Sequence, residues 1–174
     1  MMKQAVFIDR DGVINRATIR AGKSYPPQTL DEFEFLPGVV EALNRLKNAG
    51  FLLIVVTNQP DVAKGLQTRE VVEAMHERIR SLTPVDDIRV CYHVDEDRCH
   101  CRKPKPGMLT DAAKHWAIDL KTSFMVGDRW RDVDAGVAAG CKAFFIRSDI
   151  AEPLSANPHV AVSSLLEAAE AILS

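Results

Sequence analysis

Two aspartates, one residue apart, follow a short apolar segment near the start of the chain. The segment runs from Ala5 to Ile8, Asp9 and Asp11 come after it, and a glycine and then Asn15 follow. A short apolar run bounded by turn residues is typical of a buried parallel strand, and alternation places both carboxylates on one face at its carboxyl end. Carboxylates this close repel each other unless a cation, hydrogen-bond donors or a shared proton offsets the repulsion. The pair can therefore do nucleophilic or acid–base chemistry, or it can simply cap a turn.

The bulk properties predict one domain of ordinary composition. The chain has 174 residues, 47% hydrophobic and 26% charged, with a formal net charge of -2 at pH 7. This length suits one core, so residues 1–174 are predicted to form a single domain. Neither a nucleic-acid partner nor a membrane is expected, because no basic surface and no transmembrane-length apolar run is present. The start of the chain shows no signal-peptide pattern, so we expect a cytoplasmic protein. We also expect it to be a monomer.

Strand-like and helix-like segments alternate along the chain. This alternation predicts β-α-β units and therefore a Rossmann-like, doubly wound, mostly parallel sheet with helices on both faces. The residues 16–34 are predicted to be a long polar loop, and no insertion is long enough for a separate cap domain. The expected strands are 5–8, 51–56, 88–93, 123–126 and 142–146, with a short edge strand at 159–162. The expected helices lie at 38–49, 68–82, 108–117 and 133–139, with a last one after Ser164.

Distinctive polar residues stand at the ends of four of these strands. Besides the paired aspartates, they are Thr57, Asn58, Gln59, Lys103, Asp128 and Asp132. The carboxyl ends of parallel strands share one edge of a sheet, which is where ligands bind in open α/β folds. The set fits phosphoryl transfer through a carboxyl phosphate: a nucleophile, a hard cation with oxygen ligands, a lysine for the phosphoryl oxygens, and an acid for the leaving alcohol.

A short polar segment carries two pairs of metal-ligand residues. Cys91 and His93 are followed by Cys99 and Cys101. Two soft pairs of this kind suit a closed, tetrahedral zinc site, which would hold a loop that cannot build its own core. The alternative is a set of reduced cysteines with a surface histidine. We assign no functional role to the other histidines. His76, inside a predicted helix, is expected to be partly exposed.

The ordered motifs resemble a known family. Asp9-Arg-Asp11-Gly-Val, Thr57-Asn58, Lys103 and Gly127-Asp128-x-x-x-Asp132 are similar to the four motifs of the haloacid dehalogenase superfamily of phosphatases. The Cys/His segment and Arg102-Lys103-Pro104 resemble its zinc-loop subgroup, which contains D-glycero-D-manno-heptose 1,7-bisphosphate 7-phosphatases and histidinol-phosphate phosphatases. The resemblance implies a hydrolase that acts on a small phosphorylated substrate, with catalytic Mg²⁺ and structural Zn²⁺.

The resemblance also implies a role for each matching position. Asp9 would be the nucleophile, and Asp11 would be the general acid and base and lend its main-chain carbonyl to magnesium. The other implied roles are magnesium binding by Asp9 and Asp128, zinc binding by Cys91, His93, Cys99 and Cys101, and phosphate or substrate binding by Asn15, Thr57, Asn58, Gln59, Arg102 and Lys103. Asp132 would support the site, and Arg102 is the best candidate for a second anionic group because its guanidinium forks onto phosphate.

The substrate is less sharply indicated than the reaction. Phe33-Glu-Phe35-x-Pro-Gly38 and Pro106-Gly-Met108 resemble the heptose-bisphosphate enzymes, which prepare heptose for lipopolysaccharide synthesis. The five-residue gap between His93 and Cys99 is closer to the histidinol-phosphate enzymes of histidine biosynthesis. We favour the heptose substrate, with histidinol phosphate or another small ester as the alternative. A phospho-acceptor switch is disfavoured, because its phosphorylated Asp would end the third strand, where none stands here.

Overall fold

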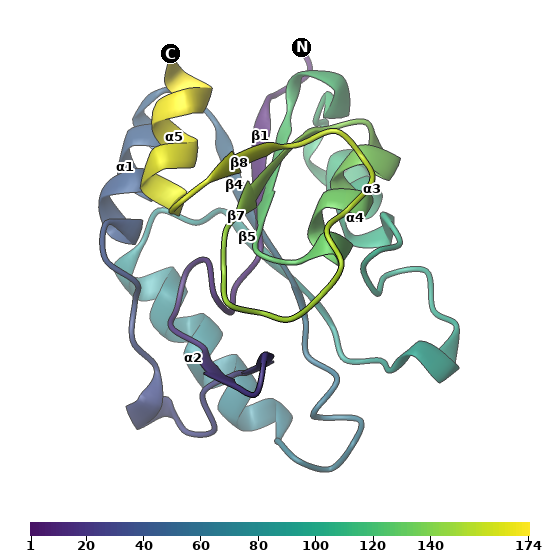
Figure 1. The fold of residues 1–174 in the computed structure, drawn as a ribbon. Helices are drawn as coiled ribbons and strands as arrows, with labels where there is room; N and C mark the ends of the chain where they lie inside the picture. The colour runs from purple at the N-terminus through teal and green to yellow at the C-terminus, as the bar shows by residue number, and fades with distance from the viewer.

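A six-stranded parallel sheet forms the middle layer of the structure, and helices cover both of its faces (Figure 1). The computed structural model describes all residues, 1–174. The strand order is β5-β4-β1-β6-β7-β8, and every neighbouring pair is parallel. The strands are β1 (Ala5–Ile8), β4 (Leu52–Asn58), β5 (Asp87–Cys91), β6 (Phe124–Gly127), β7 (Lys142–Ile146) and β8 (Val160–Val162). The predicted doubly wound sheet with helices on both faces is confirmed.

The side chains of β1 alternate between two hydrophobic cores. Val6 and Ile8 pack in a core with α1 (Val39–Asn48), α2 (Arg69–Leu82) and α5 (Leu165–Leu173). The neighbouring side chains of Ala5 and Phe7 point to the other face, which is covered by α3 (Gly107–Trp116) and α4 (Trp130–Ala139). Because the strand is buried on both faces, its sequence is a continuous apolar run instead of an alternating one.

Local sequence signals set the ends of several helices. The Thr68 hydroxyl accepts a hydrogen bond from the backbone N–H of Val71 at the start of α2, and Ser164 caps α5 in the same way. Each cap of this kind stabilises a helix by about 1 kcal/mol. Gly140 ends α4 with φ of 100°, a left-handed conformation that glycine adopts without strain. None of the helices combines the length and the apolar character needed to span a lipid bilayer.

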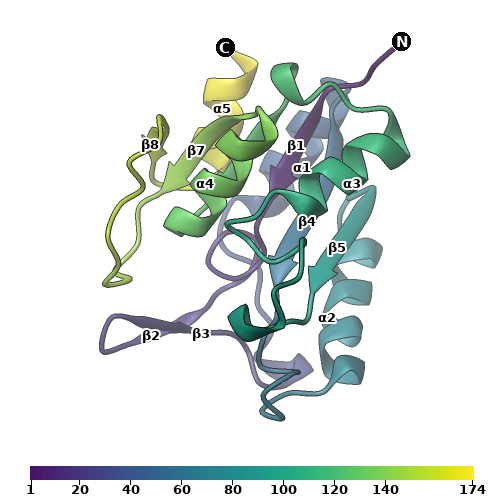
Figure 2. The same cartoon turned by 90° about the vertical axis from the view of Figure 1, so that its right-hand side faces the viewer.

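The segment predicted as a loop contains a β-hairpin. β2 (Thr18–Arg20) pairs antiparallel with β3 (Lys23–Tyr25), and a short 3-10 helix follows at Leu30–Glu32. Figure 2 shows this hairpin beyond the carboxyl ends of the sheet strands, while both chain termini lie at the opposite end. The hairpin is mostly exposed, so it has no apolar alternation by which the sequence could have indicated its strands.

Candidate active site

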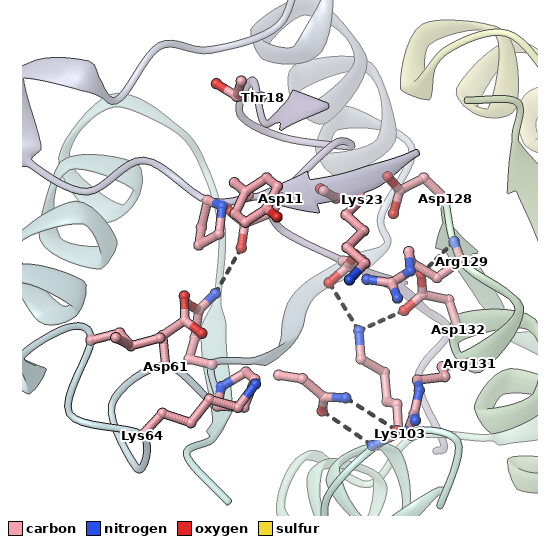
Figure 3. A pocket seen from close by; sticks show the side chains of 18 of the residues that line it. Asp11, Thr18, Lys23, Asp61, Lys64, Lys103, Asp128, Arg129, Arg131 and Asp132 are labelled. Carbon is pink, nitrogen blue, oxygen red and sulfur yellow. Dashed lines mark hydrogen bonds and ion pairs between the residues drawn. The ribbon is translucent and has the colours of Figure 1, made fainter. Parts of the chain in front are cut away.

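A polar pocket opens at the edge of the sheet where the strands end (Figure 3). Its volume is about 590 Å³, and only 2 of its 22 lining residues are hydrophobic, so the pocket suits a charged or strongly polar ligand. Asp128, Arg129 and Asp132 lie on one side of it, and Asp61 and Lys64 lie on the other. The lining includes the predicted residues Asp9, Asp11, Asn58, Gln59, Arg102, Lys103 and Asp128.

Lys103 lines this pocket and contacts three separate segments: the turn after β1, strand β4 and the first turn of α4. Its ammonium donates hydrogen bonds to Oδ1 of Asp9 at 2.9 Å, to Oδ1 of Asp132 at 2.6 Å and to the backbone carbonyl of Val56 at 2.8 Å. The residue is only 2% exposed, and burial acts to lower the pKa of a lysine. The two carboxylates outweigh burial and raise the pKa of Lys103 above its ordinary value, so the lysine stays charged.

The carboxylates around Lys103 carry more negative charge than it can balance. Burial, and then the charge of Asp132, raise the pKa of Asp9 to about 6 despite the bonds from Lys103. Burial and the charges of Asp9 and Asp132 raise the pKa of Asp128 well above its usual value. When all three are ionised, three carboxylates against one ammonium leave two negative charges, which is the charge that a divalent cation offsets.

The geometry of these carboxylates fits a metal ion. Oxygens of Asp9, Asp128 and Asp132 all lie within 4.8 Å of one another. Both oxygens of Asp132 are engaged, with Lys103 and with the backbone N–H of Arg129, whereas the buried Oδ1 of Asp128 has no hydrogen-bond partner. Asp9 and Asp128 are therefore the carboxylates free to hold a hard cation such as Mg²⁺.

Gly12 allows Asp128 to come this close to the first strand. The backbone of Gly12 has φ of 83°, in the region that favours glycine. A Cβ atom at this position would clash with the carboxylate of Asp128. Gly12 therefore affects the position of Asp128, which follows β6, as well as the turn that follows β1.

Asp11 is held by four hydrogen bonds from three side chains. Its Oδ1 accepts from Nε and Nη2 of Arg10 at 3.2 and 2.8 Å and from the Asn15 amide at 3.0 Å, and its Oδ2 accepts from the Gln59 amide at 2.9 Å. Burial acts to raise the pKa of Asp11, but Arg10 and these hydrogen bonds outweigh it and lower the pKa. Asn15 is fully buried and does not line the pocket, so its side chain orients Asp11 instead of touching a ligand there.

The Thr57-Asn58 pair also acts largely behind the pocket wall. The Asn58 amide bonds both the N–H and the C=O of Lys103 at 3.1 Å, which fixes the backbone of the lysine. Thr57 is 1% exposed, and its hydroxyl oxygen accepts a hydrogen bond from Gln59 at 2.9 Å. Of the predicted phosphate-binding residues in this stretch, Asn58 and Gln59 reach the pocket lining and Thr57 does not.

Two arginines stand side by side on one wall of the pocket. Nε of Arg102 donates to Asp95 at 2.7 Å, and Arg131 donates to both oxygens of the same carboxylate at 3.1 and 3.2 Å. Arg131 also donates to the carbonyl of Lys103 at 3.1 Å, which connects this wall to the backbone of that lysine. Asp95 thus holds two guanidinium groups next to each other beside the pocket. Guanidinium groups bind phosphate in a forked geometry.

The four predicted zinc ligands form a compact cluster. The Sγ of Cys91 lies 3.7 Å from that of Cys99 and 3.1 Å from that of Cys101, and Nδ1 of His93 lies 3.3 Å from the Cys101 sulfur. In a tetrahedral zinc site, bonds of about 2.3 Å place sulfurs about 3.8 Å apart. The cluster fits one metal ion, and Arg102 and Lys103 directly follow its last cysteine.

Two residues that the sequence analysis did not assign to the site lie behind Asp11. Arg10 is 1% exposed and is one of the largest fully buried side chains. His76 was expected to be partly exposed, and this was wrong: it is 0% exposed and its Nε2 lies 3.1 Å from Nη1 of Arg10. A signal was present, because Val72, Met75, His76 and Ile79 follow the i, i+3, i+4, i+7 spacing of a buried helix face.

The later part of the chain matches a known family model. Residues 100–168 match the family model described as HAD-hydrolase-like. That match includes Lys103, in the loop after the Cys/His cluster, and Asp128, at the end of β6.

Three named proteins with similar sequences or structures show to which members of this family the chain is related. A D-glycero-β-D-manno-heptose-1,7-bisphosphate 7-phosphatase from Pseudomonas aeruginosa is 39% identical over 153 residues, which cover 85% of this chain and 83% of that protein. The Escherichia coli K12 protein of the same name is 42% identical over 147 residues, 78% of this chain and 74% of that protein. A crystal structure of D,D-heptose 1,7-bisphosphate phosphatase from B. bronchiseptica, complexed with magnesium and phosphate, has a TM-score of 0.85 at 32% identity and covers 98% of each chain. This chain belongs to the haloacid dehalogenase-like phosphatase family that these proteins represent.

Proposed function

We propose that this protein is a magnesium-dependent phosphomonoesterase that removes the C7 phosphate of D-glycero-D-manno-heptose 1,7-bisphosphate. The observation that carries the proposal is the contact of Lys103 with Asp9 in a polar pocket that also contains Asp11 and Asp128. It supplies a nucleophile, a proton donor, a positive charge and a cation site in one place. The names of the relatives at about 40% identity support the substrate.

In the first step, an oxygen of the Asp9 carboxylate attacks phosphorus, and the bond from phosphorus to the sugar oxygen breaks. The protonated carboxyl of Asp11 gives its proton to that oxygen, so the sugar leaves as an alcohol. The dianionic phosphate group of the substrate favours the protonated form of Asp11, against the effect of Arg10.

In the second step, water attacks the phosphorus of the aspartyl phosphate. Asp11, now a carboxylate, takes the proton of this water, and the bond between Asp9 and phosphorus breaks. Phosphate is released, Asp9 is again a carboxylate, and Asp11 again carries a proton.

Asp9, Asp128 and the main-chain carbonyl of Asp11 would hold Mg²⁺. When bound, the ion would offset the repulsion between the Asp9 carboxylate and the phosphate. Lys103 would neutralise a further phosphoryl oxygen while its own position is fixed by Asn58 and Asp132.

Cys91, His93, Cys99 and Cys101 would hold Zn²⁺ in a structural role. All four positions of a tetrahedral site come from the protein, which leaves none open for chemistry. The ion would fix the loop from which Arg102 and Lys103 emerge.

Arg102 and Arg131 would receive the second phosphate of the substrate. They line the same pocket as Asp9, and Asp95 keeps both guanidinium groups together on one wall. A bisphosphate can place one phosphate at Asp9 and the other at this wall, which a monophosphate cannot do.

A phosphate-release panel tests the proposal. The purified protein would be assayed in Mg²⁺ with heptose 1,7-bisphosphate in both anomeric forms, with histidinol phosphate and with a simple alkyl phosphate. We expect the highest kcat/KM for a heptose bisphosphate. A higher value for histidinol phosphate would reject the heptose assignment and keep the reaction, whereas no release from any ester would reject both.

A further inference from the structure

We propose that Arg10 and His76 form a buried clamp that fixes the Asp11 carboxylate in the orientation needed for proton transfer. The inference rests on the proposed function, because it assigns positioning residues to its acid–base step. Neither residue lines the pocket, so both would act through Asp11 and not on the substrate.

The guanidinium of Arg10 contacts Asp11 on one side and His76 on the other. Nε and Nη2 both donate to Oδ1 of Asp11, and Nη1 points to Nε2 of His76 at 3.1 Å. Arg10 is 1% exposed, and a charged side chain is rarely buried so completely unless its partners are fixed. Its carbonyl also accepts hydrogen bonds from the backbone of Ile14 and Asn15, so the turn holds its backbone as well.

This arrangement determines which oxygen of Asp11 can carry a proton. Oδ1 already accepts three hydrogen bonds, two from Arg10 and one from Asn15, and has no room for a proton of its own. Oδ2 has a single hydrogen-bond partner, the Gln59 amide at 2.9 Å. The clamp therefore keeps Oδ1 deprotonated and presents Oδ2, beside the pocket, as the oxygen that gives and takes the proton.

His76 limits the movement of the other end of the guanidinium. Because Nη1 of Arg10 donates, Nε2 of His76 must accept, so the ring is neutral and its proton is on Nδ1. Nδ1 faces Glu73, whose Oε1 lies 3.7 Å away and accepts a hydrogen bond from Tyr92. The backing for Asp11 thus comes from helix α2, 66 residues along the chain from Arg10.

The leaving group provides a test that a purely structural role would not satisfy. A sugar or other alkyl alcohol needs a proton as it leaves, whereas 4-nitrophenolate leaves as a stable anion. The measurement is the single-turnover release of each alcohol in Mg²⁺ with enzyme in excess, which isolates the first step. We expect His76→Leu to slow release from the alkyl phosphate about 10- to 100-fold and release of 4-nitrophenol less than about threefold.

Two comparison variants separate positioning from general damage. His76→Gln keeps an acceptor near the place of Nε2 and should restore most of the rate that His76→Leu loses. Met75→Ala, at a fully buried neighbour on α2, lowers stability without removing a hydrogen bond of Arg10 and should affect both esters alike. Equal slowing of both esters in His76→Leu, or no recovery in His76→Gln, would overturn the clamp.

Two further measurements do not require His76→Leu to fold. Arg10→Lys keeps the charge but loses the fork, and should show the same selective loss for the alkyl ester. In the wild-type protein at neutral pH, the ¹⁵N shifts of His76 should show a proton on Nδ1 and none on Nε2, and a proton on Nε2 would overturn the clamp. Wild-type enzyme that releases neither alcohol would overturn the proposed function, and the clamp with it.

Discussion

The ammonium of Lys103 lies 2.9 Å from Oδ1 of Asp9, although 94 residues separate the two in the chain. Lys103 comes from the loop that follows the Cys/His cluster, and Asp9 follows the first strand. The contact fixes the plane of the Asp9 carboxylate and makes the geometry of the site depend on that loop. We therefore expect that a change in this loop alters both the chemistry at Asp9 and the binding of the cation.

Asp9→Asn is expected to lower kcat by at least about 10³-fold, because an amide cannot form the carboxyl phosphate. Rapid acid quenching of the wild-type enzyme, followed by peptide mass spectrometry, should locate the phosphate on Asp9. Full turnover by the variant, or phosphate on a different residue, would exclude the covalent role.

Magnesium is expected to raise the unfolding temperature. A ligand at 100 times its Kd stabilises a folded protein by about 2.7 kcal/mol, or about 5–10 °C for a chain of this size. Asp128→Asn should abolish this shift. In a chelator at pH 8, the same variant should be more stable than the wild type, because it removes a carboxylate that Asp9 and Asp132 repel. A normal magnesium shift in the variant would remove Asp128 from the cation site.

The Cys/His cluster is expected to carry about one zinc per chain. Cys99→Ser should reduce the zinc content and lower activity, because Arg102 and Lys103 lose their anchored loop. Cys141→Ala is the matched control, since Cys141 is a free cysteine outside the cluster and should leave the zinc in place. Elemental analysis of protein purified without added metal makes the comparison, and a zinc-free wild type would contradict it.

Arg102→Ala is expected to raise the KM for the bisphosphate at least about tenfold, which corresponds to losing one charge-assisted contact. The KM for a simple alkyl monophosphate should change little. Arg98→Ala, an exposed arginine in the same loop, serves as the control. Equal losses with both esters would place Arg102 at the transferred phosphate instead of at the second one.

The stability of the protein is expected to fall as the pH drops from about 6.5 to about 4, in part because of His76. Burial, and then the charges of Arg10 and Arg80 against those of Glu73 and Asp11, lower the pKa of His76 to about 4. The unfolded chain therefore binds a proton in this window that the folded chain does not, which costs up to about 1.4 kcal/mol per pH unit. Above about pH 6.5 His76 is neutral in both the folded and the unfolded chain, so it causes no loss of stability there.

Urea unfolding at several pH values measures this contribution as a difference between proteins. His76→Gln should show a smaller loss of stability between pH 6.5 and 4 than the wild type. His115→Gln, at an exposed histidine on α3, should keep the wild-type loss. The same loss in all three proteins would assign the pH dependence to other groups.

Sequence reasoning located the strand ends because each apolar strand stops at a polar residue. Asp9, Asp128 and Lys103 could be expected together because parallel strands share one edge. The Cys/His cluster was also visible, since two closely spaced pairs of ligands need no knowledge of the fold.

The remaining features depended on contacts between distant segments. Nothing near Arg10 in the sequence indicates that His76 lies behind it, and the helix pattern showed only that position 76 falls on the buried face of α2. The two hydrogen bonds between the Asn58 amide and the Lys103 backbone likewise join segments 45 residues apart, so the sequence did not indicate them. The hairpin of β2 and β3 was missed because its exposed strands lack apolar alternation, and its backbone hydrogen bond from Ala151 to the Gly22 carbonyl joins segments far apart in the sequence.

Both ends of the chain emerge at the end of the sheet opposite the β2–β3 hairpin (Figures 1 and 2), and residues of that hairpin line the pocket. A fluorescent reporter, an affinity tag or a surface tether fused at either terminus would stand clear of the substrate entrance. Immobilised enzyme should therefore accept substrate as freely as enzyme in solution.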